Sequence, residues 1–324
     1  MSMSRWKRRW KSDMCCLFGL IDTRHSLSGK DKSKILHILA SESEARGTDA
    51  TGIAYNLGNR LFIHKRPIPG HRLQIWVRDN TATVMGHTRM TTQGRASRNR
   101  NNHPFFGMAG NTPFALAHNG VLYNDSRLRS TQGLPKTRIE TDSYVAVQLL
   151  EQQKALDLNS LRYMAEQVEG SFTFTVLDDA ENLFIVKGDS PMCLYWFPEL
   201  GVYLYNSTEE ILSRALQRIS LPLGDHTRIP VSCGEILRIA PNGEITRGEF
   251  DNPCLLYAAP WSSYSWHRGL DFHCKRAASE LGSYLEEIKS VAMAFGYSPD
   301  EIDYLAECGF TPEELEEMLY CGEL

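Results

Sequence analysis

Cys15 directly follows a methionine, Met14, and this pair could do covalent chemistry. A start methionine before a small residue is normally removed, so if translation starts at Met14 the mature chain begins with Cys15. A cysteine supplies a nucleophile, and a nearby amine can act as its base. An α-amino group has a pKa near ~7.7–8.0, so a useful fraction is neutral at cytosolic pH. The pair indicates either a self-activated nucleophile or an ordinary half-buried cysteine beside a strand.

Three further groups of polar residues follow along the chain. They are the tripeptide 87–89 (His-Thr-Arg), the tripeptide 118–120 (His-Asn-Gly) and the dipeptide 141–142 (Thr-Asp). A single arginine is usually a solvated surface residue, and His-Asn-Gly usually forms a turn. Each group alone therefore predicts little, and their meaning depends on the elements that position them.

Composition describes a chain of ordinary globular character. It has 324 residues, 42% of them hydrophobic, and a net charge of −4. This charge gives no general attraction to nucleic acid or to a membrane surface. No apolar run approaches the ~20 residues of a membrane span. The eight cysteines form no C-x-x-C pair, so we expect no structural metal site and a reducing, cytoplasmic location.

Residues 1–14 differ from the rest of the chain. Five Arg and Lys residues alternate there with Trp6 and Trp10, against the single acid Asp13. A nucleic-acid or membrane-surface arm is one interpretation. A leader or an upstream start codon is the other interpretation, and we favour it. The segment lacks the apolar core of a secretory signal.

Apolar periodicity predicts a strand-rich domain over residues 15–250. Helices are expected at 30–45, from about 142, at 157–168 and at 208–217, and a long polar loop at 91–111. The expected strands are 17–21, 52–55, 61–63, 82–90, 114–117, 171–177, 182–187, 193–197, 201–206, 234–239 and 244–249. This order is not the alternation of a parallel α/β sheet, so two mostly antiparallel sheets covered by helices fit better.

The C-terminal part reads as an appendage. Residues 251–268 are expected to be a linker and 269–324 a helical tail, beginning with a long helix at 269–295. An acidic repeat with a period of thirteen residues, seen in 298–309 and 311–322, predicts two short helices, each with a hydroxyl N-cap, a following proline and a glutamate three residues after the cap. The tail either packs on itself or docks on a partner. Its expected apolar face is Ile302, Leu305, Leu315, Met318 and Leu319.

In this order, the motifs resemble the class II glutamine amidotransferase domain of the N-terminal-nucleophile hydrolases. The resemblance covers residues 14 to 250. The matching motifs are Met-Cys-Cys-Leu-Phe-Gly at 14–19, Arg-Gly-Thr-Asp-Ala-Thr-Gly-Ile at 46–53, Gly-His-Thr-Arg-Met-Thr-Thr-Gln-Gly at 86–94, His-Pro-Phe at 103–105, Ala-His-Asn-Gly-Val-Leu-Tyr-Asn at 117–124 and Thr-Asp-Ser at 141–143.

The resemblance implies an α+β fold, a four-layer αββα sandwich of two mostly antiparallel sheets. It implies that Cys15 attacks the side-chain amide of glutamine and forms a γ-glutamyl thioester, with its own α-amine as base. Asn119 and Gly120 would form the oxyanion hole, where removing one donor lowers rates by ~10²–10³. The remaining roles concern substrate binding and support: Arg89 would hold the α-carboxylate, Asp142 the α-ammonium, Thr92 would line the pocket, and Arg46, Asp49, His87 and His118 would support the site.

Two positions depart from the family pattern. Cys16 replaces the glycine after the nucleophile, which raises Cys16 as an alternative attacking residue, although Cys15 keeps the family spacing to Gly19. Met90 replaces the usual aromatic residue and could loosen the pocket wall.

Three functions remain open at this point. The first is a glutaminase that binds glutamine, needs no cofactor or metal, and delivers ammonia to a separate synthetase, because the residues after 250 contain no nucleotide motif. The second is a stand-alone amidohydrolase that acts on γ-glutamyl or related amides. The third is a non-catalytic binding module with this fold. Membrane and nucleic-acid partners are not expected.

Overall fold

The computed structural model describes residues 15–58 and 60–252, and beyond them Leu255, Lys289, Ala292, 297–307 and Leu315. The chain divides into two units, 1–258 and 259–324. The segment 1–14, most of the expected linker 251–268, and nearly all of the expected helix 269–295 lie outside the described residues.

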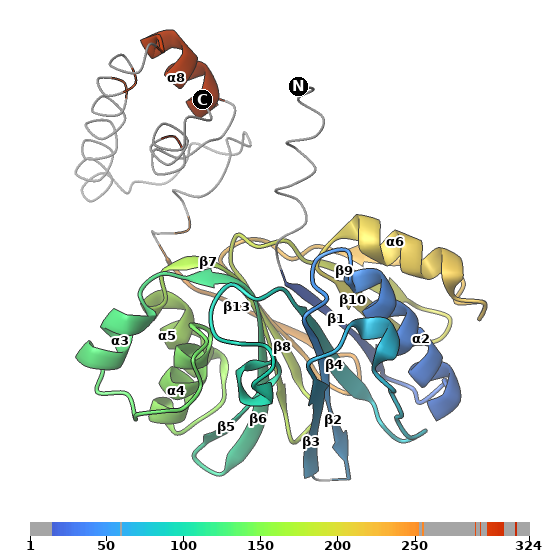
Figure 1. The fold of residues 1–324 in the computed structure, drawn as a ribbon. Helices are drawn as coiled ribbons and strands as arrows, with labels where there is room; N and C mark the ends of the chain where they lie inside the picture. The colour runs from blue at the N-terminus through green and yellow to red at the C-terminus, as the bar shows by residue number, and fades with distance from the viewer. Residues whose placement is uncertain are drawn as a thin grey trace. The chain divides into compact units, whose positions relative to one another are not determined.

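Two antiparallel sheets form the first unit over the described residues (Figure 1). The first sheet has the strand order β11-β9-β10-β1-β4-β2-β3, and the second has the order β13-β12-β8-β7-β6-β5. The strands of the first sheet are β1 (Cys16–Asp22), β2 (Ala50–Leu57), β3 (Arg60–Arg66), β4 (Thr83–Arg89), β9 (Cys193–Phe197), β10 (Val202–Asn206) and β11 (Thr227–Ile229). Those of the second are β5 (Phe105–Ala109), β6 (Thr112–Leu122), β7 (Gly170–Asp178), β8 (Leu183–Lys187), β12 (Glu235–Ile239) and β13 (Ile245–Glu249).

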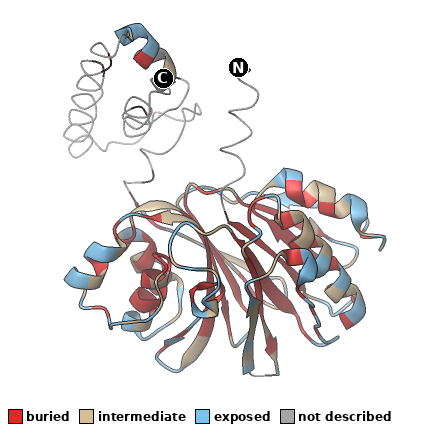
Figure 2. Ribbon diagram, viewed as in Figure 1, coloured by how far each residue is buried: buried red, intermediate tan, exposed pale blue. Residues whose placement is uncertain are grey.

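Helices cover the outer face of each sheet and complete four layers. The helices α2 (Gly29–Ser43) and α6 (Glu209–Arg218) pack on the first sheet. On the second sheet lie α3 (Asp125–Thr131), α4 (Tyr144–Gln153) and α5 (Leu158–Gln167). Figure 2 shows the buried residues concentrated on the strands and on the helix faces turned toward them. The predicted αββα sandwich is confirmed.

The helix α2 shows how the sequence specifies these outer layers. The hydroxyl of Ser28 accepts a hydrogen bond from the N–H of Asp31 and so caps the helix. Ile35, Leu36 and Leu39 then recur at helical spacing and are fully buried against the first sheet.

Side chains alternate across β1, the central strand of the first sheet. Leu17 and Ile21 belong to the core between the two sheets, whereas Phe18 and Leu20 pack toward the helices. The two-residue period of a strand therefore directs Cys15 toward the second sheet and Cys16 toward α2. The first residues of β1 thus stand on opposite faces of one sheet.

The region 91–111 differs from the predicted loop. It holds a 3₁₀ turn, η2 (Asn99–Asn101), and the edge strand β5, which pairs with β6. The strand was missed because its outward residues Phe106 and Met108 are apolar and exposed, which conceals the usual alternation. Asn119 and Gly120 lie inside β6 rather than in a turn.

In the second unit, the helix α8 (Pro299–Glu307) begins where the repeat predicts. Ser298 and Glu301 exchange the two hydrogen bonds of a capping box, at 2.8 and 3.3 Å. Ile302 and Leu315 are buried, while Met318, Leu319 and most of the second repeat lie outside the described residues. In the described part of the chain, every helix is too short or too polar to cross a membrane.

Candidate active site

Cys15 lies at the start of β1 and is nearly buried, with 9% of its surface exposed. Its thiol donates to the carbonyl of Met90 at 3.4 Å, and its own carbonyl accepts from Arg46 Nε at 3.0 Å. Burial raises the pKa of the Cys15 thiol to about 11. The sulfur is therefore protonated near neutral pH and needs a base before it can act as a nucleophile.

Cys16 occupies the other face of the same strand. Its thiol donates to Asn206 Oδ1 at 3.0 Å, and the amide of Asn206 donates in turn to Ser43 Oγ of α2 at 3.0 Å. Cys16 is fully buried in this network, and burial raises the pKa of its thiol too. The side chain points away from the polar residues that surround Cys15.

Arg89 ends β4 beside the cysteine. The register pairs Cys16 with Thr88, so the next residues outward, Cys15 and Arg89, lie next to each other. The guanidinium of Arg89 is 2% exposed and donates to Asn102 Oδ1 at 2.7 Å and to the carbonyls of Gln93 and Gly94. These bonds use three of its five N–H donors.

Asp142 also acts on the cysteine. The positive charge of Arg89 lowers the pKa of the Cys15 thiol and the negative charge of Asp142 raises it, so both groups lie near the sulfur. Asp142 is 2% exposed and accepts from the N–H of Leu122 at 2.7 Å and from the hydroxyl of Ser143 at 3.3 Å. One buried cation and one buried anion therefore flank Cys15.

Asn119 and Gly120 come to the site from the second sheet. Gly120 has a φ of +137°, and a Cβ there would meet the carbonyl oxygen of Ser171 at 1.9 Å, so the position requires glycine. The side chain of Asn119 is fully buried, and its Nδ2 donates to Ser207 Oγ at 3.3 Å. Its Oδ1 has no hydrogen-bond partner among the described residues.

Ser207 joins the two sheets at this point, and sequence reasoning missed it. Its hydroxyl accepts from the N–H of Leu17 at 2.8 Å as well as from Asn119, and its own N–H donates to the carbonyl of Leu17. Ser207 thereby fixes Asn119 relative to the strand that begins at Cys15. A lone serine after a strand gives no signal in the sequence.

Asp49, Arg46 and Thr92 have different relations to the site. Asp49 accepts from the N–H of Thr91 at 2.9 Å and donates its own N–H to the carbonyl of Arg89, so it holds the turn after Arg89. Arg46 holds the backbone of Cys15, and its Nη2 is buried without a partner among the described residues. Thr92 is exposed.

Three buried histidines, His87, His103 and His118, are held neutral. Burial lowers the pKa of His87 to about 3, and it also lowers the pKa values of His103 and His118. His87 Nε2 lies 2.9 Å from the carbonyl oxygen of His118, and this contact links the two sheets. His118 Nδ1 lies 2.7 Å from Ser143 Oγ. Groups so reluctant to take a proton are poor bases at neutral pH, so none of the three is suited to activate the thiol.

Comparisons with known proteins indicate the kind of domain to which these residues belong. A family described as "Glutamine amidotransferase domain" matches residues 87–213. The glutamine--fructose-6-phosphate aminotransferase (isomerizing) of Bacillus cereus is 32% identical over 188 residues, which cover 55% of this chain and 30% of that protein. The corresponding protein of Chlamydia muridarum is 31% identical over 222 residues, covering 65% and 35%.

A solved structure has the same fold. The glutamine phosphoribosylpyrophosphate amidotransferase of B. subtilis, complexed with ADP and GMP, aligns with a TM-score of 0.56 and 20% identity over 73% of this chain and 49% of that chain. This chain contains a glutamine amidotransferase domain. It spans about a third of the length of the aminotransferases that it matches.

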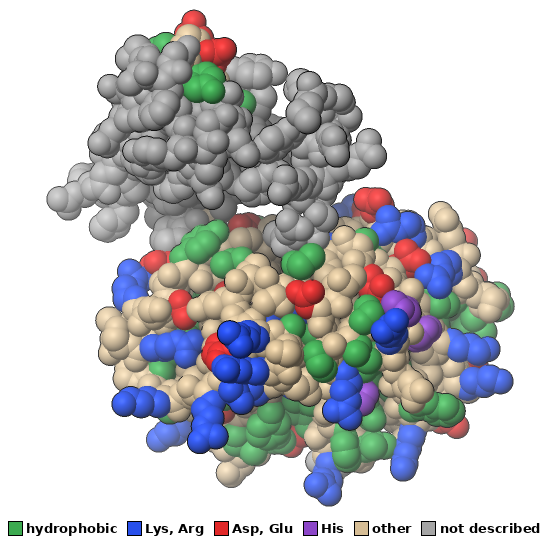
Figure 3. Space-filling view, in the orientation of Figure 1, with side chains coloured by type: hydrophobic (Ala, Val, Ile, Leu, Met, Phe, Trp, Pro, Cys, Tyr) green, Lys and Arg blue, Asp and Glu red, His purple; other side chains and the backbone are tan. Residues whose placement is uncertain are grey.

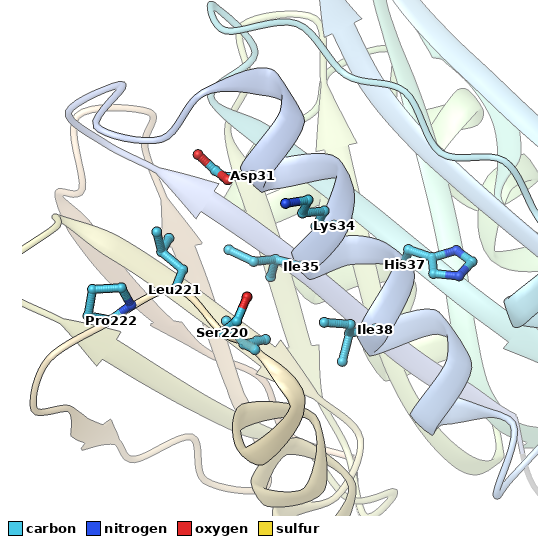
Figure 4. A pocket seen from close by; sticks show the side chains of 9 residues that line it. Asp31, Lys34, Ile35, His37, Ile38, Ser220, Leu221 and Pro222 are labelled. Carbon is cyan, nitrogen blue, oxygen red and sulfur yellow. The ribbon is translucent and has the colours of Figure 1, made fainter.

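The amidotransferase domain also has a cavity that is unrelated to Cys15. A space of about 350 Å³ lies between α2 and residues 219–222, lined mainly by apolar side chains such as Ile35, Ile38 and Leu221 (Figure 4). None of the predicted site residues lines it. Among the described residues, no group of three or more His, Cys, Asp and Glu side chains could hold a metal ion.

The surface of the amidotransferase domain carries a group of Lys and Arg side chains on the face that Figure 3 displays. Such a surface attracts any anion.

Proposed function

We propose that this protein hydrolyses the side-chain amide of glutamine through a covalent intermediate on Cys15. The observation that carries the proposal is that Cys15 adjoins buried Arg89 across the β1–β4 register and that its thiol also feels the opposite charge of buried Asp142. This pair suits the carboxylate and the ammonium of an α-amino acid. A guanidinium fork binds a carboxylate with better geometry than a lysine would.

The reaction has two halves. The Cys15 α-amine, free when no residue precedes it, takes the thiol proton, and the sulfur attacks the amide carbon of glutamine. The C–N bond breaks, the amine passes the proton to the leaving group, and ammonia departs from a γ-glutamyl thioester. Water then cleaves the thioester to glutamate and restores the thiol.

Asn119 and Gly120 stabilise the oxyanion that forms in each half. The amide of Asn119 has two N–H donors, and Ser207 accepts from Nδ2, while the backbone N–H of Gly120 is the second donor group. Preorganised donors cost no reorganisation during the reaction. The contacts of Ser207 with both sheets support this preorganisation.

Cys15 rather than Cys16 is proposed as the nucleophile. The Cys16 thiol faces α2 and is bonded to Asn206, whose amide is bonded in turn to Ser43 of that helix. Thr92 and the backbone of 90–94 would line the pocket. Ammonia is expected to pass to an acceptor enzyme on another chain in the cytosol, where the thiol stays reduced.

The test is ammonia release by chain that begins with Cys15, verified by intact mass. L-glutamine should release one ammonia per glutamate, and a diazo-ketone glutamine analogue should label Cys15 alone. Preference for γ-glutamyl peptides over free glutamine would favour the amidohydrolase alternative. No release from either substrate, with Cys15 exposed, would leave only the non-catalytic module.

A further inference from the structure

Two adjacent asparagines, Asn101 and Asn102, lie between the two charged groups of the site. Both side chains are fully buried, although asparagine is usually an exposed residue. Asn101 ends the 3₁₀ turn η2, and Asn102 directly follows it. Both lie in the segment that the sequence predicts to be a long polar loop. A buried amide is stable only when its donors and acceptors are paired, and each of these makes several hydrogen bonds.

Asn102 holds the guanidinium. Its Oδ1 accepts from Arg89 Nη1 at 2.7 Å, and its Nδ2 donates to the carbonyl of Ala96 at 2.8 Å and to Asn99 Oδ1 at 3.3 Å. Because both ends of the amide are bonded, its orientation is fixed. From β3, the Lys65 ammonium donates to the carbonyl of Asn102 and so holds its backbone too.

Asn101 holds the segment that leads to Asp142. Its Oδ1 accepts from the N–H of Glu140 at 3.0 Å, and its Nδ2 donates to Glu140 Oε2 at 2.8 Å. Its carbonyl accepts from the hydroxyl of Thr141 at 2.9 Å. Two residues directly before Asp142 are therefore bonded to one asparagine.

Gly94 shows how closely these parts are packed. It has a φ of +73°, and a Cβ there would lie 3.1 Å from Asn101 Nδ2 and 3.0 Å from the Cβ of Glu140. The carbonyl of the same glycine accepts from Arg89. The turn after Arg89, the two asparagines and the segment before Asp142 thus form one hydrogen-bonded unit.

We propose that Asn101 and Asn102 are positioning residues that set the distance between Arg89 and Asp142 and so select α-amino acid amides. This inference rests on the proposed function. Asn102 serves the carboxylate end of the substrate through Arg89, and Asn101 serves the ammonium end through the segment 140–142. Neither asparagine is assigned contact with the substrate.

Three substrates distinguish the effects at the carboxylate end from those at the ammonium end. L-glutamine has both charged groups, 4-carbamoylbutanoic acid lacks the amine, and 4-aminobutanamide lacks the carboxylate. Asn102→Ala should lower kcat/KM about 10-fold to 100-fold on the two substrates that carry a carboxylate, because a hydrogen bond to a charged group is lost. It should leave 4-aminobutanamide unaffected, and the loss should lie in KM rather than kcat.

Asn101→Ala should show the opposite selectivity. It should lower kcat/KM on L-glutamine and 4-aminobutanamide and spare 4-carbamoylbutanoic acid. Thr141→Val removes only the hydroxyl bonded to the Asn101 carbonyl, and it should show the same selectivity with a smaller effect. Thr141→Val replaces Asn101→Ala as the test if Asn101→Ala does not fold.

Asn102→Asp separates positioning from simple structural support. A carboxylate at this position would pair with Arg89 and compete with the carboxylate of the substrate. The loss on carboxylate-bearing substrates should therefore exceed that of Asn102→Ala. Asn159→Ala, at an exposed position of α5, is the matched control and should change none of the three rates.

The outcomes separate the two proposals. Equal losses on all three substrates, or none, would overturn the positioning roles while wild-type glutaminase activity upholds the proposed function. Calorimetric binding of the three hydrolysis products, L-glutamate, glutarate and 4-aminobutanoate, gives the same comparison without turnover. Wild-type protein that binds with this selectivity but releases no ammonia would refute the proposed function and keep the inference, and protein that neither binds nor reacts would refute both.

Discussion

Where β1 begins, the two faces of the first sheet give two neighbouring cysteines different surroundings. Cys15 faces the second sheet, where the charges of Arg89 and Asp142 act on its sulfur. Cys16 faces α2, where its thiol bonds with Asn206. Both thiols are buried, and burial raises both pKa values.

The comparison shows that burial and pKa do not distinguish a reactive cysteine from a structural one here. The neighbours on each face do. The inner face places Arg89, Asp142 and the buried amide of Asn119 near Cys15, whereas the outer face surrounds Cys16 with hydrogen-bond partners, apolar helix residues and the charge of Arg46. The predictions below test this difference between the faces.

The largest expected effect comes from removing the inner thiol. Cys15→Ala should lower ammonia release from glutamine by more than about 10³-fold, because no other nucleophile is placed to replace it. Cys16→Ala is the matched variant and should retain kcat within a few-fold while losing about 1–3 kcal/mol of stability. Equal loss of activity in both variants would remove the distinction between the faces.

Blocking the amine of Cys15 should have the next largest effect. Chain that retains residues 1–14 should be almost inactive, because an amide nitrogen cannot take the thiol proton. Intact mass and ammonia release measured on the same sample check this. Full activity from chain that keeps those residues would contradict the role of the α-amine.

Replacing the buried inner amide should follow. Asn119→Ala should lower kcat about 10²-fold to 10³-fold with little change in KM, because the oxyanion loses a donor. Asn206→Ala removes an amide of equal size from the outer face and should reduce thermal stability while kcat stays within a few-fold. A comparable fall in kcat for both would mean that Asn119 acts only through the fold.

Acidification should give the smallest effect, on stability. His87 has a pKa of about 3 in the fold against an ordinary value of 6.5, so the unfolded state takes up the proton first as the pH falls. Stability should be full above pH 6.5 and drop by about 2 kcal/mol at pH 5 from this residue alone.

Urea unfolding between pH 8 and pH 5 measures this dependence. The loss should be less steep for His87→Gln and unchanged for His37→Gln, whose side chain is exposed on α2. Equal slopes in all three proteins would show that the inner histidines are not held neutral by burial.

Much of this architecture was accessible from the sequence. The apolar run 17–21 identified β1 as a buried strand, and the period of a strand places Cys15 and Cys16 on opposite faces. The capping pattern at Ser298 and Glu301 predicted the start of α8 within one residue. Such patterns can be read from the sequence because their physical cause lies in residues that are close together in the chain.

Other parts depended on contacts between distant segments. Ser207 joins Asn119 to Leu17 across 88 and 190 residues of sequence, and no local pattern marks it. The network of Asn101 and Asn102 lay in a stretch that composition assigned to a loop. Polar residues there read as solvated, and only the fold shows that they are buried and paired.

The attachment of residue 15 has a consequence for maturation. Arg46 donates a hydrogen bond to its carbonyl, and its thiol donates to the carbonyl of Met90. The N–H of Leu17, two residues on, donates to Ser207 Oγ. All of these anchors lie on the side chain or on the downstream peptide. Proteolytic trimming up to this residue would therefore break none of them, so the nucleophile would already be aligned before the cut that frees its amine.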